Sequence, residues 1–314
     1  GGWSSAKVFD GTTFAKTGVV LVTVNYRLGP FGFFAHPELS SESATGSSGN
    51  QGFRDQIAAL QWVRANVVAF GGDPENVTIF GESAGSWSMS VMQASPLSRG
   101  LFHKVIGQSG ARFIPLPKLK TATRRYDSAE NHGLRLAELF AGDQKNDLTA
   151  LRAIPADKIM AVYANDPALL NNFDTLTIVD GEVLPLEVNT IFANGEQADV
   201  PVMVGSNALE ASTFDPAMFA PAGTDVSYAS VLDVQFKLAL PEAGTELVSL
   251  YPMTTEDESR SSWIDFNTDL MFTQPMNLWA DYMTRVDSPV YLYWWDWEPS
   301  VNGSREYGSF HAAE

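Results

Sequence analysis

The sequence contains no cysteine. This absence excludes thiol nucleophiles, disulfide bonds and cysteine metal sites, but it leaves the localisation unknown, because cysteine-free proteins occur in every compartment. Long apolar runs are also lacking, and the run at 19–24 is far shorter than the roughly 20 residues of a membrane-spanning helix. No signal peptide is visible, and the chain opens at Gly1 without a methionine. We therefore expect a soluble protein without a membrane span, whose native N-terminus is missing.

Basic residues are scarce, with 20 Lys and Arg against 37 Asp and Glu and a net charge of −17. Such an acidic chain is a poor partner for nucleic acid or for an anionic membrane. Histidine is scarce as well: the four histidines are scattered and form no metal-ligand cluster in the sequence. We therefore expect no metal and no organic cofactor. The sequence does not determine the oligomeric state.

The chain has enough length and apolar content for a large core, with 314 residues of which 45% are hydrophobic. Apolar strand-like runs alternate with helical segments, a pattern typical of a parallel sheet covered by helices. The predicted strands are 18–25, 77–80, 104–107, 201–205 and 290–295. The first is an unbroken β-branched run, so we expect a parallel strand there that is buried on both faces.

Helical periodicity predicts helices at 54–70, 128–142, 226–240 and 244–250. In the first helix the apolar stripe consists of Ala59, Trp62, Val63, Val67 and Phe70, and Gly71-Gly72 ends it. The Ser- and Gly-rich segment 40–52 is predicted to be a surface loop. Asp180-Gly181 predicts a tight turn between the extended segments 175–179 and 183–186.

The strand at 77–80 leads into Gly81-x-Ser83-x-Gly85, and a helical segment of small residues follows. This is the nucleophile-elbow pattern, in which a serine sits on a cramped strand-to-helix turn. We expect a glycine on each side because a side chain would clash there. The helix N-terminus behind Ser83 favours developing negative charge. An ordinary tight turn is the alternative interpretation.

A serine hydroxyl needs a neighbouring base, and histidine, with an ordinary pKa near about 6.5, is the usual one. His36 lies upstream of the serine, His103 fits a packed structural role, and His132 is expected to be exposed on a helix. His311 follows the last predicted strand, which matches the order serine, acid, histidine of α/β-hydrolases. His311 is therefore the candidate base, unless it belongs to a loose C-terminal segment.

The acid is expected in a loop after a strand between Ser83 and His311. Glu210 follows the strand 201–205 and is favoured, since Asp180 is explained by its turn and Asp296 by the end of the last strand. Its role would be to hold the tautomer of His311 and to stabilise the imidazolium.

The oxyanion of an acyl-transfer reaction needs preorganised backbone N–H donors. Ala84, directly after the candidate nucleophile, supplies one. Gly1 and Gly2, followed by Trp3, resemble the remainder of the glycine-rich oxyanion loop of esterases. Gly-Gly at a terminus would mean nothing by itself. Trp3 is a candidate for the substrate pocket, although aromatic residues more often belong to the core.

Several blocks together resemble the type-B carboxylesterase family, which includes bacterial carboxylesterases and the cholinesterases. The most specific block runs from Gly49-Asn50-Gln51-Gly52 through Phe70-Gly71-Gly72-Asp73-Pro74 to Gly81-Glu82-Ser83-Ala84-Gly85. The similarity continues at Asn25-Tyr26-Arg27, Gln108-Ser109-Gly110, Asp180-Gly181 and Gly205-Ser206-Asn207 through Glu210. One departure is Leu209-Glu210-Ala211, where the family usually has Asp-Glu-Gly.

The resemblance implies an α/β-hydrolase with a mostly parallel central sheet, flanking helices and a helical cap region. It implies Ser83 as nucleophile, Glu210 as acid, His311 as base, and Gly1, Gly2 and Ala84 as oxyanion donors. Glu82 and Ser109 match supporting positions around the triad. Because the family extends beyond both ends of the chain, we expect one incomplete domain over 1–314, with cap-like insertions at about 111–200 and 211–285.

The resulting hypothesis is hydrolysis of a small-molecule carboxylic ester through an acyl-enzyme on Ser83. Activity is expected to fall below about pH 6.5, where a free histidine becomes protonated. The alternatives are a catalytically inactive, cholinesterase-like binding module and an inactive fragment. The sequence does not identify the ester, and it does not separate esterase from amidase or thioesterase activity.

Overall fold

The structure is a computed structural model that describes residues 4–165, 177–218, 226–239, 244–300 and 307–314. The chain divides into two compact units. The first contains Gly1–Ile79, Ser90–Lys104 and Phe113–Val200, and the second contains Phe80–Met89, Val105–Arg112 and Pro201–Glu314. The predicted single incomplete domain with cap-like insertions stays a prediction.

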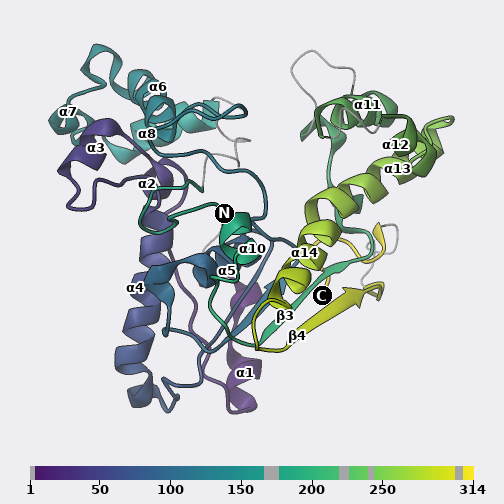
Figure 1. Cartoon of the computed structure of the whole chain (residues 1–314), viewed down its shortest axis with the longest axis horizontal. Helices are drawn as coiled ribbons and strands as arrows, with labels where there is room; N and C mark the ends of the chain where they lie inside the picture. The colour runs from purple at the N-terminus through teal and green to yellow at the C-terminus, as the bar shows by residue number, and fades with distance from the viewer. Residues whose placement is uncertain (1–3, 166–176, 219–225, 240–243, 301–306) are drawn as a thin grey trace. The chain divides into compact units, whose positions relative to one another are not determined.

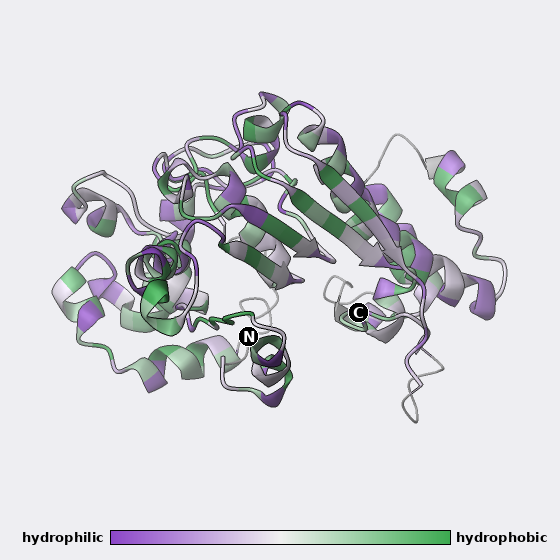
Figure 2. Cartoon of the chain, turned by 90° about the horizontal axis from the view of Figure 1, so that it is seen from below, coloured by the Kyte–Doolittle hydropathy of each residue, from purple (hydrophilic) through white to green (hydrophobic). Residues whose placement is uncertain are grey.

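The sheet that the structure describes has four strands in the order β1-β2-β3-β4. They are β1 (Thr78–Glu82), β2 (Lys104–Gln108), β3 (Val202–Asn207) and β4 (Val290–Trp295). β3 is parallel to both of its neighbours, and its Val202 lies opposite Val105 and Val290. In Figure 2 the arrows of the sheet are green, and thus hydrophobic, over much of their length. The strands predicted at 77–80, 104–107, 201–205 and 290–295 are confirmed.

The second unit packs helices around an apolar core. These helices are α11 (Tyr228–Ala239), α12 (Gly244–Leu250), α13 (Glu256–Thr268) and α14 (Gln274–Met283), with the 3-10 turns η6 (Glu210–Thr213) and η7 (Pro216–Met218). A π-helical segment, Asp269–Thr273, joins α13 to α14 without a break. The core cluster contains Ala211, Val231, Leu232, Phe236, Leu247, Trp263, Ile264 and Phe266. α14 packs across β3 and β4 (Figure 1). The helix predicted at 244–250 is confirmed, and the one predicted at 226–240 is confirmed as α11, with residue 240 outside the described residues.

The first unit is mainly helical within the described residues. Its helices are α1 (Thr12–Lys16), α2 (Gly29–Phe33), α3 (Pro37–Glu42), α4 (Gln51–Asn66), α6 (Ala129–Ala141), α7 (Leu148–Arg152), α8 (Ala156–Asn165) and α10 (Val188–Ala193). The 3-10 turns are η1 (Lys7–Phe9), η2 (Val67–Phe70), η3 (Pro96–Ser98) and η4 (Gly142–Gln144). α5 (Ala84–Ala94) belongs partly to each unit. No helix in the described part of the chain combines the length and apolar character needed to cross a membrane.

The residues that end α4 and begin α6 have the conformation and the contacts that the sequence predicts. α4 continues into η2, and the chain then turns at Gly71, whose φ of 82° lies in the left-handed region that glycine adopts without strain. α6 begins after Ser128, whose hydroxyl accepts a hydrogen bond from the backbone N–H of Asn131 at 3.2 Å. The helices predicted at 54–70 and 128–142 are thus confirmed.

The predicted buried strand at 18–25 is wrong. This run forms no strand and joins no ladder among the described residues, and Val19 and Val20 are 49% and 41% exposed. A β-branched sequence favours an extended backbone, whereas a strand also needs a partner to pair with. The expected stripe of α4 is also partly wrong: Val63 and Val67 are buried, but Trp62 and Phe70 are exposed and contact each other, with ring centroids 5.7 Å apart and ring planes tilted by 47°.

The segment 40–52 is not the solvated loop that its composition predicts. It begins in α3, and Ser47, Ser48 and Asn50 are buried. Arg54 of α4 donates a hydrogen bond to the Ser47 hydroxyl at 2.9 Å and forms an ion pair with Glu182. The Ser47 hydroxyl also donates to Glu182 at 2.8 Å, and the Asn50 side-chain amide donates to the carbonyl of Ile178 at 2.9 Å. Hydrogen bonds to this distant segment satisfy the two polar groups and allow their burial.

The turn at Asp180-Gly181 is present, but its flanking strands are not. Asp180 accepts hydrogen bonds from the backbone N–H groups of Glu182 and Leu184, and Gly181 has a φ of 84°. In the described part of these flanks Val179 forms an isolated bridge to Lys118, while 175–176 lie outside the described residues. The side-chain bonds of Asp180 therefore define the turn without a hairpin.

Candidate active site

Ser83 occupies the turn between β1 and α5. Its φ is 55°, a left-handed conformation that a non-glycine residue adopts only when the surrounding structure holds it. The backbone supplies that support: Ser83 N–H donates to the carbonyl of Gln108 at 2.9 Å, and the N–H of Trp87 donates to the carbonyl of Ser83 at 3.0 Å. The strand-to-helix turn predicted from Gly81-x-Ser83-x-Gly85 is therefore present.

The two glycines that flank Ser83 are not equivalent. A Cβ at Gly81 would lie 2.4 Å from the carbonyl carbon of Gly85, so position 81 accommodates only glycine without a shift of the backbone. A Cβ at Gly85 would meet no heavy atom within 4 Å. The prediction that a side chain would clash on both sides of Ser83 is thus confirmed for Gly81 and wrong for Gly85. The backbone of Gly85 is the group that a side chain at position 81 would meet.

Glu210 and His311 are in direct contact within the second unit. His311 Nδ1 lies 2.7 Å from Oε2 of Glu210, whose side chain is fully buried. Glu210 begins the 3-10 turn η6, which is separated from the end of β3 by two residues, and its Oε1 accepts a hydrogen bond from the backbone N–H of Asn207 at 2.7 Å. A buried carboxylate held at both oxygens has a fixed direction, and it therefore fixes the imidazole ring that it contacts.

The loop that carries His311 accepts hydrogen bonds at two of its carbonyl groups from residues in and next to η6. Leu209 N–H donates to the carbonyl of Ser309 at 3.2 Å, and the Ser212 hydroxyl donates to the carbonyl of Tyr307 at 2.6 Å. Since both anchors flank Glu210 in sequence, they bring the loop to the acid.

Two aromatic rings pack against the imidazole of His311. The Phe272 ring centroid lies 4.7 Å from that of His311, and the Phe214 centroid lies 5.4 Å from it. Phe272 belongs to the π-helical segment between α13 and α14. Extra-wide turns of this kind are frequent at functional sites, and here the turn places a buried ring against the histidine.

The second nitrogen of His311 faces Glu82. His311 Nε2 lies 3.1 Å from Oε1 of Glu82, the residue before Ser83. The Ser83 hydroxyl makes no hydrogen bond to any described residue. The structure therefore brings His311 together with Glu210 and Glu82, and in this conformation the nitrogen that would serve Ser83 is occupied.

The carboxylates around His311 shift pKa values in the cluster. Burial raises the pKa of Glu82 to about 7, with further increases from the charges of Glu314 and Glu210 and a decrease from His311. Burial lowers the pKa of His311, but its hydrogen bond to Glu210 and the nearby negative charges outweigh that effect, so its pKa lies above the usual value. Perturbed pKa values of this kind are typical of functional sites.

Sequence reasoning missed two polar residues of this cluster, Glu314 and Asn207. Glu314 accepts hydrogen bonds from the Ser109 hydroxyl at 2.9 Å and from the Asn207 side-chain amide at 2.6 Å. The same amide donates to the carbonyl of Phe310 at 2.7 Å. Ser109, which the resemblance placed at a supporting position around the triad, thus binds Glu314. The available signals were weak: Glu314 follows His311 by three residues, and Asn207 precedes Glu210 by three.

The remaining predicted site residues are the oxyanion donors and the candidate pocket residue Trp3. Gly1, Gly2 and Trp3 lie outside the described residues, while Ala84 begins α5 directly after the elbow. No cluster of His, Asp or Glu suitable for a metal ion occurs in the described part of the chain.

The other three histidines have their own partners or surroundings. His36 is buried, with its Nε2 2.9 Å from the carbonyl of Lys145. His103 Nδ1 accepts the N–H of Val77 at 3.2 Å, in agreement with the structural role predicted for it. His132 was expected to be exposed, but it is half-buried and lines a cavity.

Known proteins resemble the whole chain. The model of the carboxylesterase family matches residues 2–314. The chain belongs to the carboxylesterase family. The para-nitrobenzyl esterase of Bacillus subtilis (strain 168) is 35% identical over 321 residues, which cover 100% of this chain and 60% of that protein. The fumonisin B1 esterase of Sphingopyxis macrogoltabida is 38% identical over 298 residues, covering 93% of this chain and 51% of that protein.

A solved structure of a PNB esterase matches the fold with a TM-score of 0.78 at 31% identity, covering 100% of this chain and 62% of that one. The predicted α/β-hydrolase fold and the predicted membership of the type-B carboxylesterase family are confirmed. The chain spans 51–60% of the length of the two relatives named above.

Proposed function

We propose that this carboxylesterase-family chain hydrolyses carboxylic esters through an acyl-enzyme, with Ser83 as nucleophile, His311 as base and Glu210 as the orienting acid. The contact between His311 Nδ1 and the buried Glu210 carboxylate, at 2.7 Å, is the observation that carries the proposal. The strained turn at Ser83 supports it, because a nucleophile elbow has this geometry. The esterase names of both relatives support the reaction class.

The first step requires His311 Nε2 to exchange one partner for another. With Nδ1–H donating to Glu210, Nε2 carries a lone pair and accepts the Ser83 proton while the serine oxygen attacks the ester carbonyl. Nε2 lies 3.1 Å from Glu82 in this conformation, so the imidazole or Glu82 has to move before attack. The imidazolium then protonates the leaving alcohol. His311 next takes a proton from the water molecule that attacks the acyl-enzyme, and it returns this proton to the Ser83 oxygen as the carboxylic acid leaves.

The developing oxyanion needs N–H donors near Ser83. We assign the N–H of Ala84 to this role because α5 begins there and directs its first N–H groups toward its N-terminus. Gly1 and Gly2 complete the proposed oxyanion site, and Trp3 is the proposed pocket residue. The substrate class is a small-molecule ester.

A fluorophosphonate probe tests the nucleophile. We expect it to label the chain once, and Ser83→Ala to abolish labelling and to lower ester hydrolysis by roughly 10⁴-fold or more. Ser88→Ala is the matched control, since Ser88 lies one helical turn further along α5 with its hydroxyl donating to the carbonyl of Ala84 at 3.0 Å. Labelling that persists in Ser83→Ala and disappears in Ser88→Ala would place the nucleophile elsewhere.

The same experiment separates catalysis from binding without catalysis. A chain that unfolds cooperatively on heating but is neither labelled nor active would be a binding module. A chain that shows no cooperative transition would be an inactive fragment. A series of p-nitrophenyl esters with increasing acyl length then measures which acyl groups the site accepts.

A further inference from the structure

A cavity of about 210 Å³ lies within the first compact unit. Part of its lining is apolar, with Phe33, Ala35, Pro117, Leu136 and Ile178. The rest is polar or charged, with Arg125, Tyr126, Asp127, His132 and Arg135 among the lining residues. Drug-sized ligand pockets measure about 300–1,000 Å³. This volume therefore suits a ligand of small size that has both an apolar and a polar part.

The only acidic side chain in the lining, Asp127, is already satisfied. Its carboxylate pairs with Arg135 Nη1 at 2.6 Å, and accepts hydrogen bonds from Asn131 Nδ2 at 3.0 Å and the backbone N–H of Ser128 at 2.7 Å. The hydrogen bond from Arg135 is the main reason that the pKa of Asp127 falls to about 2. Asp127 and Arg135 thus neutralise each other, and the carboxylate has little capacity left for a cation.

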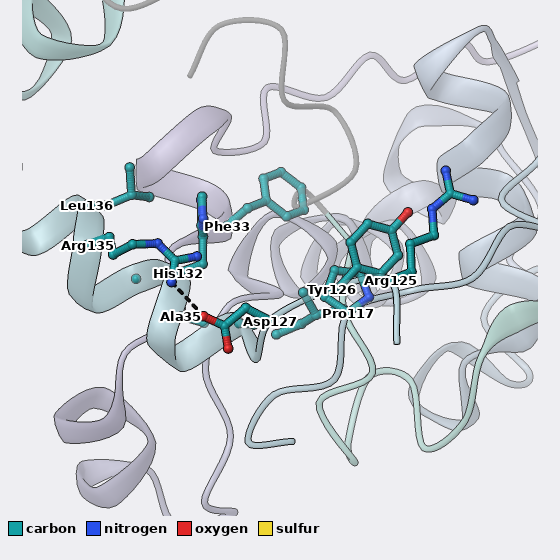
Figure 3. A pocket seen from close by; sticks show the side chains of 12 residues that line it. Phe33, Ala35, Pro117, Arg125, Tyr126, Asp127, His132, Arg135 and Leu136 are labelled. Carbon is teal, nitrogen blue, oxygen red and sulfur yellow. Dashed lines mark hydrogen bonds and ion pairs between the residues drawn. The ribbon is translucent and has the colours of Figure 1, made fainter. Parts of the chain in front are cut away.

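Arg125 is the charge in the lining that is not neutralised. Its guanidinium lies over the Tyr126 ring, 5.4 Å from the centroid, and it forms no ion pair with any described residue. A cation over a ring face is attracted to the ring, and the N–H donors of the guanidinium stay available to an oxyanion. Figure 3 shows Arg125 and Tyr126 together at one end of the lining, with His132 and Arg135 at the other and Phe33 between them.

His132 neither neutralises the positive charge of Arg125 nor adds a second charge to the cavity near neutral pH. Burial and the adjacent Arg135 lower its pKa, so the imidazole is neutral there. The local sequence strengthens the positive field: 118–135 contains five basic and two acidic residues in a chain whose net charge is −17. An isolated basic region on an acidic protein attracts small anions.

We propose that this cavity binds a small organic carboxylate, whose charged group pairs with Arg125 and whose apolar body lies along Phe33 and Ala35. A neutral ligand would leave the Arg125 donors unused, and a cation would be repelled by them. A monocarboxylate matches both the single free positive charge and the apolar lining between the two ends of the cavity.

Benzoate is a suitable probe, and calorimetric titration of the full chain measures its affinity. We expect the Kd to rise by about tenfold or more in Arg125→Gln, the size expected when a charge-assisted hydrogen bond is lost. Arg124→Gln makes the same change of charge one residue away, at an exposed side chain outside the lining, and is expected to leave the Kd within about twofold. Benzamide, which matches the shape of benzoate without its charge, is expected to bind at least about tenfold more weakly.

Three outcomes would overturn the proposal: no benzoate binding at millimolar concentration, an equal loss in both arginine variants, or benzamide binding as tightly as benzoate. Benzoate bound beside Ser83 as a product-like ligand would be insensitive to Arg125→Gln, and that result would also count against the cavity. None of these results depends on whether the chain hydrolyses esters.

Discussion

At the scale of single residues, the two nitrogens of His311 contact different carboxylates. Glu210 lies 2.7 Å from Nδ1, and Glu82 lies 3.1 Å from Nε2. The proposed reaction needs the first contact, because it orients the ring, but it needs the second one to open. The pKa of Glu82, about 7, places its titration near neutral pH. When Glu82 takes up a proton, its attraction for the imidazole weakens. Protonation of Glu82 therefore affects whether His311 Nε2 can turn to Ser83, and it also affects the pKa of His311.

The Glu82→Gln substitution is expected to move the acid limb of the pH profile of kcat/KM downward. His311 accepts the Ser83 proton only while it is neutral. The negative charge of Glu82 helps to raise the pKa of His311, so the wild-type limb lies above pH 6.5. A neutral glutamine lets the imidazole lose its proton at a lower pH. Rates of p-nitrophenyl ester hydrolysis between pH 5 and 9 measure the limb.

Glu75→Gln is the matched control for this profile. Glu75 contacts a different histidine, with its carboxylate 3.6 Å from Nε2 of His103. Its substitution is expected to leave the acid limb unchanged. An upward shift in Glu82→Gln, or equal shifts in both variants, would contradict the role that we give to Glu82.

Glu314 is expected to act by positioning the loop that carries His311. Its carboxylate accepts hydrogen bonds from Ser109 and Asn207, and Asn207 also donates to the carbonyl of Phe310. In Glu314→Gln one acceptor oxygen is replaced by a donor that faces donors. We expect kcat to fall roughly 10- to 100-fold with little change in KM, because small displacements of a catalytic group are costly.

Kinetics and stability together test this role for Glu314. Glu314→Gln is expected to lower the free energy of unfolding by about 1–3 kcal/mol, the cost of an unsatisfied buried polar group. Urea unfolding measures this change. If kcat stays at the wild-type value while stability falls, Glu314 supports only the fold.

The proposed triad follows from the sequence more directly than its surroundings do. Ser83 lies in a local motif, and Glu210 and His311 follow from chain order relative to predicted strands. Glu314 and Asn207 were missed because their roles arise from contacts across more than 100 residues of chain. The contact between Glu82 and His311 was also not predicted, since a sequence pattern does not specify which rotamer a histidine adopts.

At the scale of elements, the two glycines that flank Ser83 are expected to differ in how much an alanine in their place lowers the free energy of unfolding. Gly81→Ala places a Cβ 2.4 Å from the carbonyl carbon of Gly85, whereas Gly85→Ala places one in open space. We expect Gly81→Ala to lower the free energy of unfolding by about 1–3 kcal/mol, as overpacking does. Gly85→Ala is expected to change it by less than about 0.5 kcal/mol. Chemical denaturation of both variants measures the difference, and equal losses would show that the predicted clash is relieved by backbone movement.

The elements that sequence reasoning missed are those defined by distant partners. The run at 18–25 is richer in β-branched residues than β2 and β3, but those strands pair with neighbours and this run does not among the described residues. Local polarity likewise marked 40–52 as a loop, while Arg54 and Glu182 supply contacts that bury Ser47. Helices such as α6 and α11 were predicted well because their periodicity and caps are local properties.

At the scale of the whole molecule, two surface properties oppose each other. The net charge of −17 keeps molecules apart at neutral pH. Large apolar side chains are nevertheless exposed on β4, where Tyr291 and Trp294 are 58% and 54% exposed. β4 is also the last strand in the order of the described sheet, and an edge strand with exposed aromatic residues favours association. The balance between these properties depends on salt, because salt screens the charges.

We expect self-association to increase between about 0.1 M and 1 M salt, as the Debye length falls from about 10 Å to about 3 Å. Trp294→Lys is expected to reduce this association, even though it makes the net charge less negative and would favour association through charge alone. Gln144→Lys makes the same change of charge at an exposed polar position and is the control. Sedimentation velocity at both salt concentrations measures the assembly. If the two variants associate to the same extent, the exposed face of β4 is not the surface through which the molecules meet.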